Sequence, residues 1–265
     1  MPVVAILSQK GGVGKTTVCL GLAEAAHRHG WRTLVIDLDP QANASDVLLD
    51  QPSDLTMNDV LADGRAGIAA EAVRGSTWGA GLDVIPSEQA LEHRNRDDAA
   101  SSSARLRTVL GGLRDDYDLV LIDCPPSIGE LTVNALAAAD RAVTVTEPGF
   151  FALRGAEQAL QAITIVRDAS NLSLRAAGII VNRYRRNVRE HNRRIQELRE
   201  VYPGLVLRPV LPERSAIAVA HGSGVPIQSL SNRQARAVSE AFDELVRAVS
   251  GLRDSEQGRW KEQHD

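Results

Sequence analysis

Residues 8–17 read Ser8-Gln9-Lys10-Gly11-Gly12-Val13-Gly14-Lys15-Thr16-Thr17. An apolar run, 2–7, precedes this stretch, and apolar residues at helical spacing follow it from Val18 onward. A glycine-rich turn between a strand and a helix is the context that a phosphate-binding loop requires. Backbone N–H groups and the helix N-terminus attract phosphate oxygens there, Lys15 adds a positive charge, and the Thr16 hydroxyl can ligate Mg²⁺.

The loop departs from the general template G-x-x-x-x-G-K-[ST] in two places. Gln9 stands where the first glycine is expected, and an extra lysine, Lys10, follows it. The stretch therefore resembles the deviant phosphate loop of the ParA/MinD family of P-loop ATPases, Lys-Gly-Gly-x-Gly-Lys-Thr-Thr. The resemblance implies that Lys10 reaches across a dimer interface to the partner's nucleotide, whereas the simpler interpretation is a solvated loop cation. It also implies nucleotide contacts from Gly11, Gly12, Val13, Gly14, Lys15, Thr16 and Thr17.

The composition is that of a globular α/β protein. The 265 residues are 43% hydrophobic with a net charge of −4, enough apolar material for a substantial core. We expect a single ATPase domain over 1–252 and a polar, disordered tail over 253–265. Because we find no charged leader and no apolar run long enough to cross a bilayer, we predict a cytoplasmic protein. Cys19 and Cys124 lie in apolar patterns and are predicted to be buried thiols.

Strand-like and helix-like segments alternate along the chain. Such alternation predicts a doubly wound α/β fold, with a mostly parallel sheet flanked by helices on both faces. Ligands bind at the carboxyl ends of the strands in this architecture. The predicted strands are 2–7, 32–38, 82–85, 119–123, 142–146, 176–181 and 205–210, and the clearest predicted helices are 101–114, 154–168 and 233–252.

Two of these strands end in carboxylates. Asp39 follows the strand 32–38, and Asp123 ends the strand 119–123. Carboxylates at neighbouring strand ends, beside a phosphate loop, are suited to hold Mg²⁺ or the attacking water. We therefore predict a metal site formed by Thr16, Asp39 and Asp123. In the resembled family, the stretch around Asp39 is the first switch, Asp39 is needed for hydrolysis, and 125–127 corresponds to the second switch.

The adenine site is predicted from the last part of the chain. Asn182 ends the strand 176–181, and relatives use an asparagine there to read the edge of the base; a simple loop cap is the alternative. The stretch Leu211-Pro212-Glu213 resembles the family loop that closes over the base. Pro212 and Glu213 are therefore further nucleotide-binding candidates.

Together these residues predict Mg²⁺-dependent hydrolysis of ATP. Phosphoryl transfer depends on placing a water in line and neutralising charge on the γ-phosphate. We assign catalytic roles to Lys10, Lys15 and Asp39. The resemblance implies an ATP-dependent homodimer and slow hydrolysis until a partner completes the site.

Three classes of protein share this kind of site. They are a ParA-type ATPase, which binds DNA without sequence preference and responds to a ParB-like partner; a MinD-type membrane ATPase; and a metabolic relative, such as a nitrogenase iron protein or an amidoligase. An arginine-rich segment favours the first class, since residues 183–199 hold seven arginines against two glutamates. A solvated helix face is the simpler interpretation. The predicted DNA contacts are Arg183, Arg185, Arg186, Arg189, Arg193, Arg194 and Arg214.

Three further observations bear on these classes. Ala216 stands where many chromosomal ParA proteins carry an arginine, so the basic surface is predicted to centre elsewhere. The amphipathic stretch 233–252 is acidic on its polar face and is expected to pack against the sheet, which argues against membrane binding. Cys124, directly after Asp123, does not resemble a nitrogenase cluster ligand. We expect a cytoplasmic protein that associates with the nucleoid when it binds ATP.

Overall fold

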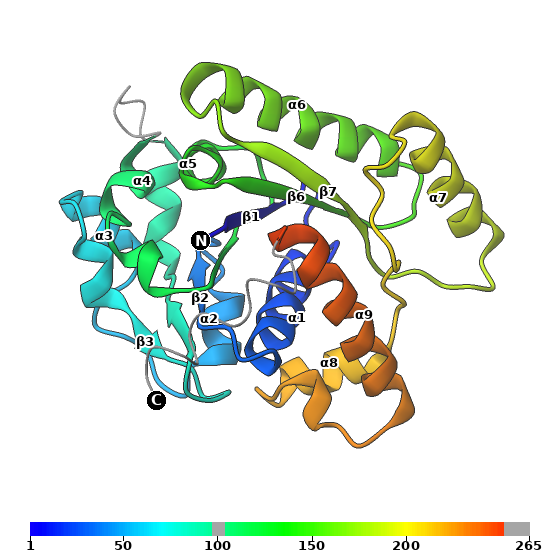
Figure 1. Ribbon diagram of the computed structural model, residues 1–265, viewed down its shortest axis with the longest axis horizontal. Helices are drawn as coiled ribbons and strands as arrows, with labels where there is room; N and C mark the ends of the chain where they lie inside the picture. Colours follow the sequence, from blue (N-terminus) through cyan, green and yellow to red (C-terminus); the bar gives the residue numbers. More distant parts are fainter. Residues whose placement is uncertain (97–103, 252–265) are drawn as a thin grey trace.

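A computed structural model describes residues 1–96 and 104–251 of the chain (Figure 1). These residues form a seven-stranded sheet in the order β3-β4-β2-β5-β1-β6-β7, in which β3 runs antiparallel to β4 and all other neighbours are parallel. The strands are β1 Val3–Leu7, β2 Thr33–Asp37, β3 Arg74–Gly75, β4 Leu82–Ile85, β5 Leu119–Asp123, β6 Arg141–Thr146 and β7 Arg175–Val181.

Helices cover both faces of this sheet, which confirms the predicted doubly wound architecture. The α-helices are α1 Lys15–Arg28, α2 Asn43–Leu48, α3 Met57–Asp63, α4 Arg105–Val109, α5 Glu130–Ala138, α6 Ala152–Ser170, α7 Arg189–Val201, α8 Ser215–Gly222 and α9 Arg233–Ser250. Short 3₁₀ segments are η1 Ile68–Ala72, η2 Gln89–Arg96, η4 Leu113–Asp116 and η5 Ile227–Ser229.

The central strand β1 shows why its sequence is apolar throughout. Val4 and Ile6 pack into the core on the side of α1 and α9. Ala5 and Leu7 pack into the core on the side of α5 and α6 (Figure 1). Because successive side chains of a strand point to opposite faces, a parallel strand with helices on both sides has no polar face.

Helix α9 packs along α1 through its apolar side. Val238, Phe242 and Leu245 are buried, as the amphipathic pattern predicts. The Phe242 ring occupies the space beside Gly21 of α1, where an added Cβ would lie 2.3 Å from ring carbons. The glycine therefore lets the two helices approach closely, and the apolar side of α9 is covered by the protein itself.

Two predicted elements differ from the structure. The predicted strand 205–210 was wrong, because the chain there makes only an isolated bridge, between Val206 and Ile179. Pro209 has no N–H to donate to a ladder, which explains why pairing stops. The predicted helix 101–114 is short, since α4 ends at Val109 and Gly112 adopts a φ of 83°. The start of that helix and the predicted tail 253–265 lie outside the described residues.

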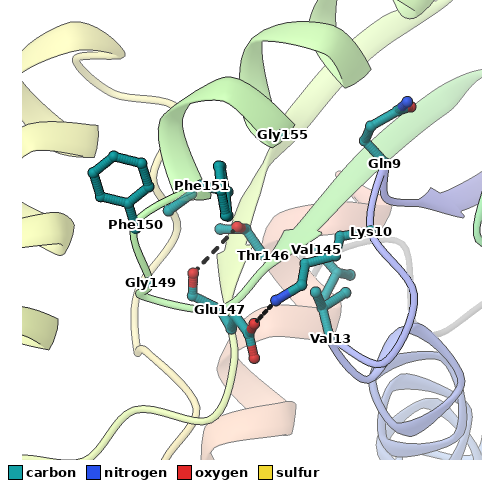
Figure 2. A pocket seen from close by; sticks show the side chains of 11 residues that line it. Gln9, Lys10, Val13, Val145, Thr146, Glu147, Gly149, Phe150, Phe151 and Gly155 are labelled. Carbon is teal, nitrogen blue, oxygen red and sulfur yellow. Dashed lines mark hydrogen bonds and ion pairs between the residues drawn. The ribbon is translucent and has the colours of Figure 1, made fainter.

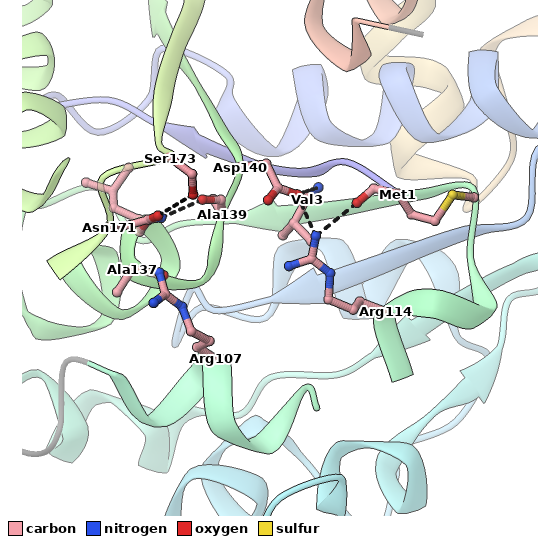
Figure 3. A network of polar contacts seen from close by, with 10 residues as sticks. Met1, Val3, Arg107, Arg114, Ala137, Ala139, Asp140, Asn171 and Ser173 are labelled. Carbon is pink, nitrogen blue, oxygen red and sulfur yellow. Dashed lines mark hydrogen bonds and ion pairs between the residues drawn. The ribbon is translucent and has the colours of Figure 1, made fainter. Parts of the chain in front are cut away.

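Polar contacts link the chain at the amino ends of the strands, which is the end of the sheet opposite the predicted site (Figure 3). The Asp140 carboxylate accepts hydrogen bonds from the backbone N–H of Val3 and from Arg114, each 2.8 Å long. Arg114 also donates to the carbonyl oxygen of Met1. The Asn171 amide donates to the carbonyl oxygens of Leu136 and Ala139. These groups satisfy one another, so we assign this edge a structural role.

Candidate nucleotide site

The phosphate-binding loop connects β1 to α1. Gly12 and Gly14 have φ angles of 77° and 88°, a left-handed conformation that favours glycine. Lys15 is the first helical residue and is 6% exposed. The loop borders a cavity of about 420 Å³, here called the phosphate cavity. Its lining comprises Gly11, Gly12, Gly14, Lys15, Thr16, Thr17, Leu20, Asp39, Gln41, Asn43, Asp46, Val47, Pro126, Arg183 and His221.

Asp37 and Asp123 lie side by side at the carboxyl ends of β2 and β5, and both are fully buried. Asp37 accepts hydrogen bonds from the Ser45 hydroxyl, at 2.7 Å, and from the backbone N–H groups of Ser45 and Asp39. Burial raises the pKa of Asp37 to about 6, although these hydrogen bonds oppose the rise. Asp37 therefore ties the start of α2 to the strand, a role that the sequence did not reveal.

Asp123 has a different environment from Asp37. Among the described residues its nearest donor is the Thr16 hydroxyl, which is close enough to lower its pKa but lies outside good hydrogen-bond geometry. Burial raises its pKa well above the ordinary value, and the negative charge of Asp37 adds to the rise. Thr16 and Lys15 are near enough to oppose it. A buried carboxylate with so few donors is costly to ionise, and a cation beside it would offset that cost.

Asp39 lies at the rim of the same cavity. It is 6% exposed, and its carboxylate accepts a hydrogen bond of 3.0 Å from the backbone N–H of Gln41. Burial raises its pKa, while that hydrogen bond and the charge of Lys15 lower it. The cavity thus brings Lys15, Thr16 and Asp39 together, with Asp123 beneath them.

These side chains fit a magnesium ion that is shared with a nucleotide. Among residues 1–96 and 104–251, no group of three or more His, Cys, Asp or Glu side chains could hold a metal alone. Mg²⁺ is commonly held by one or two carboxylates, phosphate oxygens and water. The buried carboxylate of Asp123, the nearby Thr16 hydroxyl and the Asp39 carboxylate would supply the protein's share of such a site.

A second cavity, of about 750 Å³, adjoins the first and is here called the base cavity. Asn182, Pro212 and Glu213 line it, as do Thr17, Arg183, Arg214, Ser215, Ile217, Ala218 and His221. The structure therefore brings the three predicted adenine residues together. Asn182 is 2% exposed, and its side-chain nitrogen donates a hydrogen bond of 2.9 Å to the carbonyl oxygen of Val13.

Lys10 lies apart from the buried lysine. Its side chain is 57% exposed and forms an ion pair with Glu147, which follows β6 (Figure 2). Next to this pair are the exposed rings of Phe150 and Phe151, whose centroids lie 5.1 Å apart. A charged and aromatic surface therefore adjoins the phosphate loop.

The seven arginines predicted to bind DNA occupy three kinds of environment. Arg185 pairs with Glu213, while Arg193 and Arg194 pair with glutamates of α7, Glu190 and Glu197. Arg183 lines both cavities. The remaining three, Arg186, Arg189 and Arg214, are exposed and form no ion pair with the described residues. Ala216, at the position of a frequent family arginine, is buried in α8.

Several lining residues had no role predicted from the sequence. Gln41 and Asn43 follow Asp39 in the first switch stretch, so their position next to that residue was the available signal. No sequence pattern indicated that His221 lines the site. It reaches the cavities because α8, which carries it, folds back from forty residues beyond the end of β7. Both cysteines are buried free thiols, as predicted. No helix in the described part of the chain is long and apolar enough to span a bilayer.

Comparison with known proteins agrees with this geometry. A family model described as an AAA domain matches residues 1–176. The chromosome partitioning protein ParA of Caulobacter vibrioides is 36% identical over 93% of each chain. The chromosome-partitioning ATPase Soj of Treponema pallidum is 32% identical, over 93% of this chain and 96% of Soj. A structure of cobyrinic acid a,c-diamide synthase from Mycobacterium smegmatis with bound ADP and magnesium is 28% identical, with a TM-score of 0.78, over 93% of this chain and 94% of that one.

The parallel sheet and the loop between β1 and α1 define the class of P-loop nucleotide-binding proteins. Within that class, the chain belongs to the ParA/Soj family of partitioning ATPases.

Proposed function

We propose that this protein hydrolyses ATP with Mg²⁺ and uses the cycle to partition DNA. The observation that carries the proposal is the fully buried carboxylate of Asp123 next to Lys15 and Thr16, which stand at the end of the phosphate loop. Lys15 and the loop residues 11–17 bind the phosphates. Thr16, Asp39 and Asp123 hold Mg²⁺ directly or through water. The ion would neutralise charge on the phosphates during transfer.

Asp39 is proposed to position the attacking water. It lines the phosphate cavity, and its raised pKa leaves a carboxylate that holds a proton more readily than an exposed one. Asn182, Pro212 and Glu213 bind the adenine in the base cavity. Hydrolysis is slow in the isolated protein, because the site is completed by a second subunit and stimulated by a ParB-like partner.

Lys10 is proposed to link ATP binding to dimerisation. It is exposed beside the phosphate loop and can leave the exposed ion pair with Glu147 at little cost. In the ATP-bound dimer it contacts the nucleotide of the partner subunit. The exposed rings of Phe150 and Phe151 lie on the same surface, and apolar side chains of this kind are typical of interface cores.

The dimer is proposed to bind double-stranded DNA through the arginines around α7. Arg186, Arg189 and Arg214 are exposed and free of ion pairs with described residues, so they are the most available for phosphates. Such contacts give affinity that depends steeply on salt and little on sequence. The ATP-bound protein would then associate with the nucleoid in the cytoplasm.

The membrane alternative has less support. A membrane-binding helix needs an apolar face that the protein leaves free, whereas α9 packs its apolar face against α1. The similarity to cobyrinic acid a,c-diamide synthase keeps a metabolic function open to the same test.

A DNA-binding titration tests the proposal. Binding to duplexes of unrelated sequence should be measured with ATP, ADP and no nucleotide at several salt concentrations, with Lys15→Ala as the nucleotide-free control. We expect binding that requires ATP, weakens steeply as salt rises and disappears in the control. Binding that ignores ATP, or binding to anionic vesicles in place of DNA, would contradict partitioning.

A further inference from the structure

The phosphate cavity and the base cavity meet at three residues. Thr17, Arg183 and His221 line both of them. A nucleotide that occupies both cavities must pass this junction, where its sugar joins its phosphates. Thr17 belongs to the phosphate loop, whereas Arg183 and His221 come from distant parts of the chain. The function proposed above gives His221 no role. For Arg183 there is only the DNA contact that was predicted from the sequence.

Arg183 lines the junction with an exposed side chain and an unusual backbone conformation. It follows Asn182 with a φ of 57°, one of two non-glycine residues with positive φ among the described residues. A bulky side chain pays free energy for this conformation, and such strain is concentrated at functional sites. Arg183 forms no ion pair with a described carboxylate, although its charge helps to lower the pKa of Glu213. Its guanidinium is therefore available to a ligand in the cavities.

His221 lines the same junction from near the end of α8. Its Nε2 atom is buried and has no hydrogen-bond partner in the described part of the chain, so the ring must turn before this nitrogen can reach a ligand in the cavities. Burial lowers the pKa of the imidazole, so the ring is neutral at pH 7. A neutral imidazole offers one donor and one acceptor, which matches a sugar hydroxyl that can both donate and accept.

We propose that Arg183 and His221 contact the nucleotide at this junction. Arg183 contacts its phosphates, and His221 contacts its ribose. The proposal rests on nucleotide binding as described above and reassigns Arg183 from DNA to the nucleotide. The guanidinium suits phosphate oxygens, because it presents several N–H donors and stays charged. Both residues would act on the nucleotide of their own subunit.

Calorimetric titration with ADP tests the role of Arg183. Arg183→Ala should weaken ADP binding by at least about tenfold, the effect expected from losing a charged hydrogen bond. Arg183→Gly should weaken it equally while keeping or raising the melting temperature, since glycine adopts this φ without strain. Arg175→Ala, at the other end of β7, is the matched control and should bind ADP normally. The assignment would be overturned if both Arg183 variants bound ADP within twofold of the wild-type affinity. It would also be overturned if Arg175→Ala lost as much ADP affinity as they do.

Titration with 2′-deoxy-ADP tests the role of His221. The wild type should prefer ADP by about fivefold, the effect of one hydrogen bond, and His221→Ala should lose that preference. An unchanged preference in the variant would overturn the ribose contact. Wild-type protein that binds no ADP at all would refute the proposed function itself, whereas normal wild-type binding with insensitive variants would refute only this inference.

Discussion

The side-chain amide of Asn182 donates a hydrogen bond to the carbonyl oxygen of Val13, with the two atoms 2.9 Å apart. The end of β7 thereby holds the phosphate-binding loop, across 169 residues of sequence. Gly14 follows Val13, and Asn182 fills the space in which a Gly14 side chain would stand. The contact links the base cavity to the phosphate cavity through the loop itself.

Gly14→Ala should abolish nucleotide binding. The added Cβ would lie 2.3 Å from the Asn182 amide nitrogen, and the φ of 88° disfavours any side chain. Calorimetric titration with ADP measures the loss. Gly30→Ala is the control, because its φ of 77° is strained in the same way but its added Cβ meets nothing within 4 Å. Nucleotide binding should survive in the control, and equal loss in both variants would show that strain alone is responsible.

Asp123→Asn should raise the melting temperature of the nucleotide-free protein and remove the effect of Mg²⁺ on ATP affinity. The amide keeps the size of the carboxylate but carries no buried charge. Because the folded pKa of Asp123 lies above its unfolded value, the folded wild type holds a proton that the unfolded chain releases. Its stability therefore falls as pH rises above about 4, and the advantage of the variant should grow over that range. A variant less stable than the wild type at pH 7 would contradict this account.

Asp39→Ala should keep ATP binding and trap the dimer. The carboxylate lies at the rim of the phosphate cavity, so its loss removes the proposed water-positioning group and leaves the loop intact. Sedimentation velocity in ATP and Mg²⁺ should show a dimer that persists for hours, with phosphate release reduced by at least about a hundredfold. A dimer that decays at the wild-type rate would contradict the role of Asp39.

Lys10→Ala should bind ATP normally but stay monomeric. The side chain is exposed and its ion pair with Glu147 is of the weak surface kind, so removing it should change stability by less than about 1 kcal/mol. Sedimentation velocity and calorimetric titration separate the two properties. Normal ATP-dependent dimers in this variant would refute the proposed contact with the partner's nucleotide.

Gly21→Ala should destabilise the fold by about 1 to 3 kcal/mol through overpacking. The new methyl group would stand 2.3 Å from the Phe242 ring at the contact of α1 with α9. Urea denaturation measures the change. Combining the substitution with Phe242→Leu should recover part of the loss, because the smaller side chain frees space beside residue 21. If the double variant lost as much unfolding free energy as the two single variants together, the result would argue against a direct clash.

Much of the fold could be predicted because its signals are local. The run 2–7, the glycines after it and Lys15 predicted a strand, a loop and a helix, and the structure has all three. The run 119–123 similarly predicted β5, since a strand buried on both faces must be apolar along its length. The segment 205–210 looked similar but lies at the edge beside β7 with a proline inside it, so its pairing is limited to the single bridge between Val206 and Ile179.

The sequence by itself determined the class of loop, the alternation of strands and helices, and the carboxylates at strand ends. Only the tertiary structure decided how those carboxylates differ: Asp37 accepts hydrogen bonds from Ser45, whereas Asp123 has only the nearby Thr16 hydroxyl and the charge of Lys15. It also brought Arg183 and His221 to the junction of the two cavities. The physical reason is that hydrogen bonding and burial depend on which distant residues meet, whereas strand and helix patterns depend on neighbours along the chain.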